Sequence, residues 1–220
     1  MTEYLYPDAR IAVFARAPRL GAVKTRLEPA IGPAGCLQLY QALLAKTLHT
    51  VRQARLAPIR LWVTDSPEHP AFTSLNNDAS VSLQQGADLG ARMLYTAESA
   101  LAEPGVERVI IIGTDCPGLD KPYLQAALAG LQCESDSVAP VVIGPAEDGG
   151  YVLLGMTRAV PEILLDMEWG NEQVLPRTLA RLHNHAIAHV LLEPRWDVDR
   201  PEDLDRLKAA FPELSAGLSW

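Results

Sequence analysis

Short apolar runs alternate along this chain with longer segments in which apolar residues recur at helical spacing. The short runs predict strands at residues 11–14, 59–64, 81–84, 107–112, 137–143, 151–155 and 189–192. The periodic segments predict helices at residues 33–54, 88–102, 122–131, 171–185 and 201–210. Strands separated by helices favour an α/β fold, in which a largely parallel sheet carries helices on both faces.

The size and composition of the chain fit one such domain. Its 220 residues, of which 48% are hydrophobic, suffice for a single sizeable core. No internal repeat, low-complexity tract or obvious linker divides the sequence. We therefore expect a single domain over residues 1–220.

The composition also argues against several classes of protein. No apolar run approaches the roughly 20 residues that cross a bilayer, and the first residues lack the pattern of a secretory signal. The three cysteines show no CxxC spacing, which disfavours a disulfide scaffold or a structural zinc site. A net charge of -8 disfavours nucleic-acid binding, which needs a basic face. We expect a cytoplasmic protein without a transmembrane segment.

Polar clusters follow the predicted strands, where ligands bind in open α/β sheets. The first cluster, at residues 15–27, concentrates basic side chains in an otherwise acidic chain: Arg16, Arg19, Lys24 and Arg26. Arginine and lysine both bind phosphate, and Gly21 permits a close backbone approach. The common phosphate-loop and dinucleotide fingerprints are absent. This loop is therefore either a phosphate-binding segment or a solvated basic loop.

The second cluster, at residues 112–119, places Asp115 directly after the most strand-like segment. A carboxylate there suits a hard divalent cation such as Mg²⁺, which takes one or two carboxylates together with substrate phosphates. The alternative is a turn-capping aspartate. Asp120, just before Pro122, is the better N-cap of the next helix. Cys116 has no neighbouring base and is interpreted as a packing residue.

The third cluster, at residues 144–151, combines Glu147 and Asp148 with two glycines. One carboxylate suits a general base or a metal ligand, and the glycines leave room for a substrate. The alternative is a β-hairpin turn, for which Asp-Gly and Gly-Gly are preferred pairs.

The fourth cluster, at residues 196–204, contains Asp197 and Asp199 on the same side of an extended segment. Either could contact a metal. The alternative for Asp199, which precedes Pro201, is the N-cap of the closing helix.

Five ordered segments together resemble one bacterial family of glycosyltransferase-like proteins, some of them in arsenosugar biosynthesis. The segments are residues 13–18 with 24–27, 88–93, 113–117, 144–151 and 197–204. The family belongs to the GT-A, or nucleotide-diphospho-sugar transferase, superfamily. The resemblance extends over about residues 11–207, and five ordered motifs are more specific than any one of them.

The resemblance implies a GT-A fold, which is a three-layer α/β/α arrangement around a mixed, mostly parallel sheet. It implies a nucleotide-binding half at about residues 9–145 and an acceptor-facing half at about residues 146–220. The implied nucleotide-binding residues are Arg16, Lys24, Thr25, Arg26, Arg92, Gly113 and Thr114, and the implied metal ligands are Asp115 and Asp199. Glu147 and Asp148 resemble the acidic pair that holds the catalytic base, with Gly149, Gly150 and Tyr151 at the substrate pocket.

The chain departs from the superfamily at two points. Cys116 and Pro117 follow Asp115, so the D-x-D motif of many glycosyltransferases is missing, and so is the G-x-G-x-R loop of nucleotidyltransferases. Phospholactate guanylyltransferases are more distantly similar: they share a Lys-Ser/Thr-Arg-Leu element. They show Gly-Thr-Asn where this chain has residues 148–151, and this difference favours glycosyl transfer.

The leading hypothesis is a metal-dependent glycosyltransferase that uses a nucleotide-sugar co-substrate, Mg²⁺ or Mn²⁺, and a small-molecule acceptor. One alternative is a nucleotidyltransferase, guanylyltransferase-like, that joins a nucleoside triphosphate to a phosphorylated small molecule. Another is a non-catalytic module that binds a nucleotide sugar. The base, the sugar, the acceptor, the stereochemical course and the oligomeric state stay open.

Overall fold

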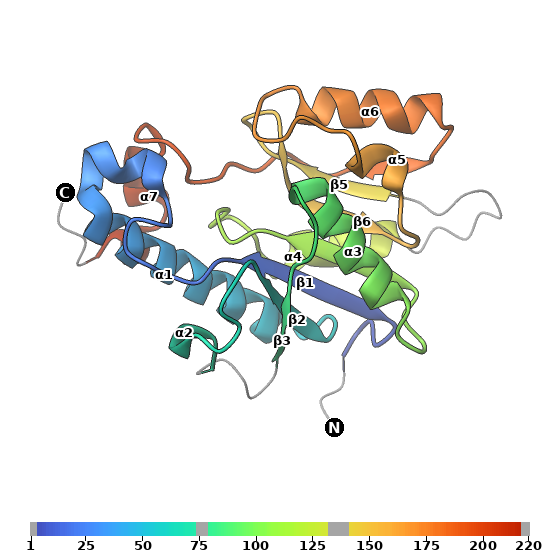
Figure 1. Ribbon diagram of the computed structural model, residues 1–220, viewed down its shortest axis with the longest axis horizontal. Helices are drawn as coiled ribbons and strands as arrows, with labels where there is room; N and C mark the ends of the chain where they lie inside the picture. Colours follow the sequence, from blue (N-terminus) through green and yellow to red (C-terminus); the bar gives the residue numbers. More distant parts are fainter. Residues whose placement is uncertain (1–3, 74–78, 132–140, 217–220) are drawn as a thin grey trace.

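A mixed seven-stranded sheet forms the centre of the computed structural model, which describes residues 4–73, 79–131 and 141–216 (Figure 1). Its strand order is β3-β2-β1-β4-β6-β5-β7. The strands are β1 Ala9–Ala15, β2 Ile59–Val63, β3 Ala79–Leu83, β4 Arg108–Ile112, β5 Val141–Pro145, β6 Tyr151–Met156 and β7 His189–Leu191. Only β6 runs against its neighbours β4 and β5, and the other described pairs are parallel. The prediction of a mixed, mostly parallel sheet is confirmed.

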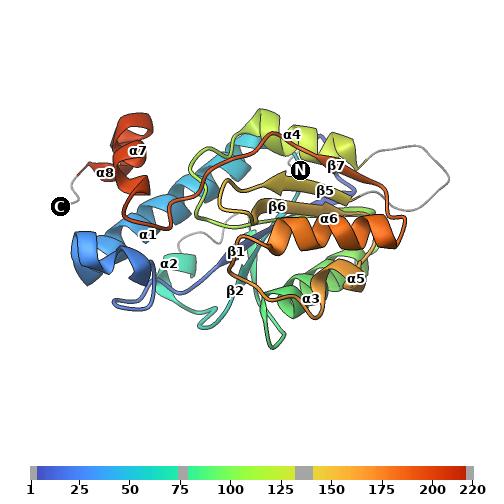
Figure 2. The ribbon, with the colours of Figure 1, turned by 90° about the horizontal axis from the view of Figure 1, so that it is seen from above.

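Helices cover both faces of the sheet. They are α1 Glu28–Ala54, α2 Pro70–Thr73, α3 Leu89–Leu101, α4 Lys121–Gly130, α5 Pro161–Leu164, α6 Val174–Asn184, α7 Asp203–Ala210 and α8 Pro212–Ser215, with a 3-10 turn η1 at Thr25–Leu27. Figure 2 shows α1 and α4 on one face and α3, α5 and α6 on the other. Among the described helices, none combines the length and the apolar character needed to cross a membrane.

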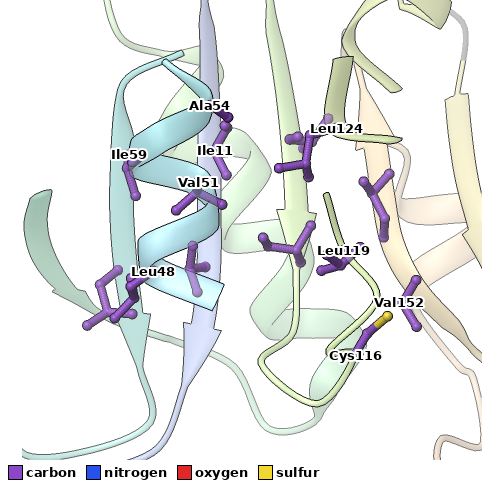
Figure 3. Packing of buried hydrophobic residues seen from close by; sticks show 14 of the residues in the cluster. Ile11, Leu48, Val51, Ala54, Ile59, Cys116, Leu119, Leu124 and Val152 are labelled. Carbon is purple, nitrogen blue, oxygen red and sulfur yellow. The ribbon is translucent and has the colours of Figure 1, made fainter. Parts of the chain in front are cut away.

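The core lies on both sides of the sheet. Under α1 and α4, buried side chains such as Ile11, Leu48 and Leu124 pack together (Figure 3). A second cluster lies under α3, α5 and α6, around Ile111 and Leu154. The sheet is thus covered on both faces, as expected for strands that read as continuous apolar runs.

A third cluster lies at the end of the molecule where α1 begins. It joins Leu27 and Leu39 to Trp196, Val198 and Leu207 from the C-terminal segment. Figure 1 shows this segment crossing the molecule after β7 to reach α7 beside the start of α1. The crossing brings the last residues back to the first loop.

Local signals in the sequence account for most element boundaries. Asp88 and Asp120 cap α3 and α4, each accepting a backbone N–H bond from three residues on, as predicted for Asp120. At Gly32 the backbone has φ 65, which separates the first turn of α1 from the helix predicted at residues 33–54. The short elements η1, α2, α5 and α8 were not predicted, because three or four residues do not establish a period. Residues 137–140 of the predicted fifth strand lie outside the described residues.

Candidate active site

A cavity of about 530 Å³ opens at the carboxyl ends of β1, β2, β3 and β4 and at the start of β6. Ten of the fourteen predicted site residues line it: Arg16, Lys24, Thr25, Arg26, Arg92, Gly113, Thr114, Asp115, Tyr151 and Asp199. The other four, Glu147, Asp148, Gly149 and Gly150, lie in the β5–β6 turn and do not line the cavity. The rule that ligands bind at the carboxyl ends of the strands in open α/β sheets, called the strand-end rule below, therefore located the cavity.

The basic loop after β1 is held by Tyr40 of α1. The Tyr40 hydroxyl accepts a bond of 2.7 Å from the Arg16 backbone N–H and donates one of 3.0 Å to the Arg16 carbonyl. Burial raises the pKa of Tyr40 to about 12, so this hydroxyl stays protonated and can donate. Tyr40 was not predicted as a site residue, since an apolar helical period explains it equally well.

Lys24 directs its side chain inward rather than into solvent. Its backbone is left-handed, with φ 53, and its side chain is only 4% exposed. The ammonium lies 2.6 Å from Oδ1 of Asp115 and donates a bond of 2.5 Å to the Val198 carbonyl. Arg26, two residues on, pairs with Asp199. The two cations expected at phosphates thus contact the two carboxylates expected at a metal.

The segment before α7 completes the cavity through backbone contacts. The Val198 N–H donates a 2.9 Å bond to the Asp115 carbonyl. The Asp203 carboxylate accepts bonds from the N–H groups of Asp199 and Arg200, at 2.9 and 2.7 Å. The alternative role for Asp199 as a helix cap is therefore wrong: α7 begins at Asp203, and Asp203 supports the turn, which leaves the Asp199 side chain at the cavity.

Asp197 also lines the cavity, although it was only an open alternative to Asp199 in the sequence. Burial, together with the carboxylates of Asp148, Asp115 and Asp199, raises its pKa to about 6, while Lys24 opposes this rise. Three neighbouring carboxylates thus act on Asp197. The two-residue spacing of Asp197 and Asp199 predicted that both lie on the same side of an extended segment, and both indeed line the cavity.

The protein side chains at the cavity supply only some of the ligands that a hard cation needs. Among the described residues, no three His, Cys, Asp or Glu side chains are grouped as a complete metal site. Oδ1 of Asp115 is buried and, despite the close Lys24 ammonium, has no well-directed hydrogen bond. These features fit a cation such as Mg²⁺, which takes one or two carboxylates and completes its shell with phosphates and water.

The β5–β6 connection is a hairpin turn, as the alternative interpretation of that cluster proposed. The Asp148 carboxylate accepts a 2.9 Å bond from the Gly150 N–H, and Gly149 has φ 90. Glu147 instead forms an ion pair with Arg206 of α7. Asp148 is near enough to Asp197 to raise its pKa, so of the two acidic residues Asp148 is the one coupled to the cavity.

Aromatic packing closes the wall of the cavity next to β6. The Tyr151 ring lines the cavity and meets Trp169 edge-on, with centroids 6.1 Å apart.

Helix α3 packs closely on α5. The α-carbon of Gly90 lies so near α5 that a Cβ there would clash with the Leu164 carbonyl. On the same helix, Arg92 lines the cavity and bonds to the Gly86 carbonyl at 3.3 Å.

Residues 47–171 match the model of a family described as "Uncharacterized protein conserved in bacteria (DUF2064)". This chain belongs to that family. Among curated proteins, no sequence matches the DUF2064 chain.

Solved structures match the DUF2064 chain over nearly its whole length. A candidate nucleotide-diphospho-sugar transferase from Desulfovibrio desulfuricans G20 is 28% identical, with a TM-score of 0.83 over 97% of this chain and 90% of that one. A nucleotidyl transferase from Methanothermobacter thermautotroptrophicus is 14% identical, with a TM-score of 0.59 over 93% and 98%. A Mycobacterium tuberculosis H37Rv protein, in complex with manganese, is 18% identical, with a TM-score of 0.50 over 90% and 97%. The DUF2064 chain therefore has the GT-A, or nucleotide-diphospho-sugar transferase, fold.

Proposed function

We propose that this chain is a transferase that moves a glycosyl group from a nucleotide sugar to a small-molecule acceptor, with Mg²⁺ or Mn²⁺ at the donor diphosphate. One observation carries the proposal: carboxylates and basic side chains line the same cavity at the carboxyl ends of the strands. The carboxylates are Asp115, Asp197 and Asp199, and the basic residues are Arg16, Lys24, Arg26 and Arg92. Such mixed charge suits a metal-bound diphosphate.

Asp115 is the first metal ligand in this proposal, because its buried Oδ1 lacks a well-directed hydrogen bond. Asp197 and Asp199 are the candidates for the second position. Burial desolvates the Asp197 carboxylate, which interacts electrostatically with Asp115, whereas Asp199 pairs with Arg26. When bound, the metal would supply charge neutralisation at the departing diphosphate.

Arg16 and Arg92 are the residues best placed to hold the diphosphate directly. Both line the cavity, and in the part of the chain that the structure describes no carboxylate pairs with either guanidinium. A guanidinium can grip a phosphate through two parallel N–H bonds. Lys24 and Arg26 add positive charge beside them.

Asp148 is the proposed general base for an acceptor hydroxyl, and Tyr151 forms part of the acceptor pocket. Asp148 belongs to a turn fixed by its own bond to the Gly150 N–H and interacts electrostatically with Asp197. Cys116 is unsuited to nucleophilic attack, since burial raises its pKa to about 12. The resemblance to arsenosugar-biosynthesis members makes small hydroxylated acceptors the first class to test.

Nucleotidyl transfer is the second candidate, because a nucleotidyl transferase shares the fold. The two reactions would use the same cations but break different bonds. Glycosyl transfer breaks the bond between the sugar carbon and the diphosphate and releases a nucleoside diphosphate. Nucleotidyl transfer breaks a phosphoanhydride bond and releases pyrophosphate. A non-catalytic module would bind a nucleotide sugar and release neither.

The test is a thermal-shift screen of nucleotides, nucleoside triphosphates and nucleotide sugars with and without Mn²⁺, because a ligand of the folded state raises its stability. Asp115→Asn is compared with Asp120→Asn, a matched change five residues along the same loop. Asparagine caps helices as well as aspartate does, so Asp120→Asn should keep the fold of the loop.

Stabilisation by a nucleotide sugar that needs Mn²⁺, and that is lost in Asp115→Asn but kept in Asp120→Asn, would support the proposal. Hits are then incubated with acceptors and the products measured. Pyrophosphate release would select nucleotidyl transfer. Mn²⁺-independent stabilisation that Asp115→Asn leaves unchanged would exclude the metal assignment.

A further inference from the structure

The ammonium of Lys24 occupies a position surrounded by oxygen atoms from distant parts of the chain. It lies 2.6 Å from Asp115 Oδ1 and 2.5 Å from the Val198 carbonyl oxygen. Asp197 lines the same cavity and interacts electrostatically with both Lys24 and Asp115. Carboxylate and backbone carbonyl oxygens are the ligands that hard divalent cations take in proteins.

The backbone part of this oxygen-lined position is fixed before any ligand arrives. Val198 is fully buried, and its N–H bonds to the Asp115 carbonyl, so its own carbonyl has little freedom to turn away. Lys24, by contrast, carries its charge on a flexible four-carbon side chain that also lines the cavity. The Val198 carbonyl is therefore the stationary partner and the ammonium is the mobile one.

We propose that Asp115, Asp197 and the Val198 carbonyl form a cation position that the Lys24 ammonium fills in the ligand-free chain and yields to a divalent metal. The displaced ammonium then turns to the phosphate oxygens that arrive with the metal. This proposal rests on the metal requirement of the proposed function. It makes Lys24 a positioning residue that keeps Asp115 and Asp197 compensated until the donor is present.

Charge explains why the exchange depends on phosphate. Mn²⁺ alone would add two positive charges and leave a buried ammonium without a partner, which is unfavourable. A diphosphate supplies that partner. Metal and diphosphate should consequently each strengthen the binding of the other, and Lys24 should be the source of much of this coupling.

The test measures Mn²⁺ binding, through the resonance of free Mn²⁺, without and with inorganic pyrophosphate. Lys24→Met is compared with Arg26→Met. The second change removes one positive charge from the same loop, but Arg26 pairs with Asp199 and not with Asp115. We expect Lys24→Met to bind Mn²⁺ about tenfold more tightly than the wild type without pyrophosphate, and to lose most of the enhancement that pyrophosphate gives. Arg26→Met should change the affinity much less.

Mn²⁺ binding by Lys24→Met that is no tighter than by the wild type, or no tighter than by Arg26→Met, would overturn the exchange while leaving the proposed function intact. No Mn²⁺ binding by any variant would overturn both. Should Lys24→Met fail to fold, Lys24→Gln removes the same charge but keeps a donor for the Val198 carbonyl, and the same affinities decide.

Discussion

Arg206 holds Glu147 through two hydrogen bonds, of 2.6 and 3.0 Å, and its guanidinium stacks 4.5 Å over the Trp196 ring. The Arg206 hydrogen bond lowers the pKa of Glu147 below its ordinary value. The two acidic residues of the β5–β6 turn therefore have different surroundings. Glu147 belongs to a partly exposed ion pair, whereas Asp148 bonds to the Gly150 N–H and interacts electrostatically with Asp197, which lines the cavity.

Replacing the two acidic residues separately should therefore give different results. Asp148→Asn should lower the turnover of a responsive donor and acceptor by about 10²- to 10⁴-fold, the usual contribution of a general base. Glu147→Gln should lower turnover less than about threefold and cost about 0.2 to 1 kcal/mol of stability, as for an exposed ion pair. Turnover and urea unfolding of both variants check this. Equal losses of turnover would contradict the separation of roles.

Asp197 should make the stability of the metal-free chain fall as the pH rises from about 4 to 6. Its raised pKa, about 6, means that the folded chain keeps a proton that the unfolded chain loses near pH 3.8. The Asp197 carboxyl therefore costs the folded state no stability below about pH 4, and its charged form destabilises the folded state above about pH 6. Asp197→Asn should remove this fall and raise the free energy of unfolding at pH 8 by roughly 1 to 2 kcal/mol.

Urea unfolding in EDTA at pH 4, 6 and 8 measures this effect. Asp205→Asn, which removes the same charge at an exposed position of α7, is the control. The assignment fails if Asp197→Asn and Asp205→Asn show the same pH profile.

Cys116 should be inert to alkylation in the native chain. Its side chain is 3% exposed, and burial holds its pKa near 12, so little thiolate exists at pH 8. We expect iodoacetamide to spare Cys116 and the buried Cys36 in the native chain and to label both in urea. Peptide mapping by mass spectrometry checks both sites. Rapid native labelling of Cys116 would contradict its interpretation as a packing residue and make it a candidate nucleophile.

Gly90→Ala should destabilise the chain although alanine is the better helix former. The new methyl group would clash with the Leu164 carbonyl and lie 2.8 Å from the Trp169 ring, so α3 would have to move from α5. Overpacking of this kind costs about 1 to 3 kcal/mol. Gly113→Ala, whose methyl group meets no atom within 4 Å, should cost less than about 1 kcal/mol. Urea unfolding compares them, and equal costs would refute the packing argument.

Local signals in the sequence were enough to predict the strands and the place of the cavity. The strand at Arg108–Ile112 is a nearly continuous apolar run because both its faces are covered. Asp120 caps α4 by accepting a bond from the backbone N–H three residues further on. Asp115 follows that strand, so the strand-end rule placed it at the cavity. Each of these inferences needed only neighbours in sequence.

The pairing of the charges could not be predicted, because it depends on residues far apart in sequence. Lys24 and Val198 are 174 positions apart, and Arg26 and Asp199 are 173 apart. No local pattern separates Glu147 from Asp148, since the distinction comes from Arg206, 59 residues after Glu147. The late start of α7, at Asp203, was missed for a different reason, because proline at 201 suggested an earlier helix start.

The return of the C-terminal segment to the first loop also sets an order of events. Closing a loop between Lys24 and Val198 carries a large entropic cost, so these contacts form after the more local parts of the sheet. During synthesis, β1 and β4 leave the ribosome well before Val198 does. A nascent chain can therefore pair β1 with β4 long before the Val198 carbonyl reaches Lys24, so the proposed cation position is completed only when the chain has nearly finished folding.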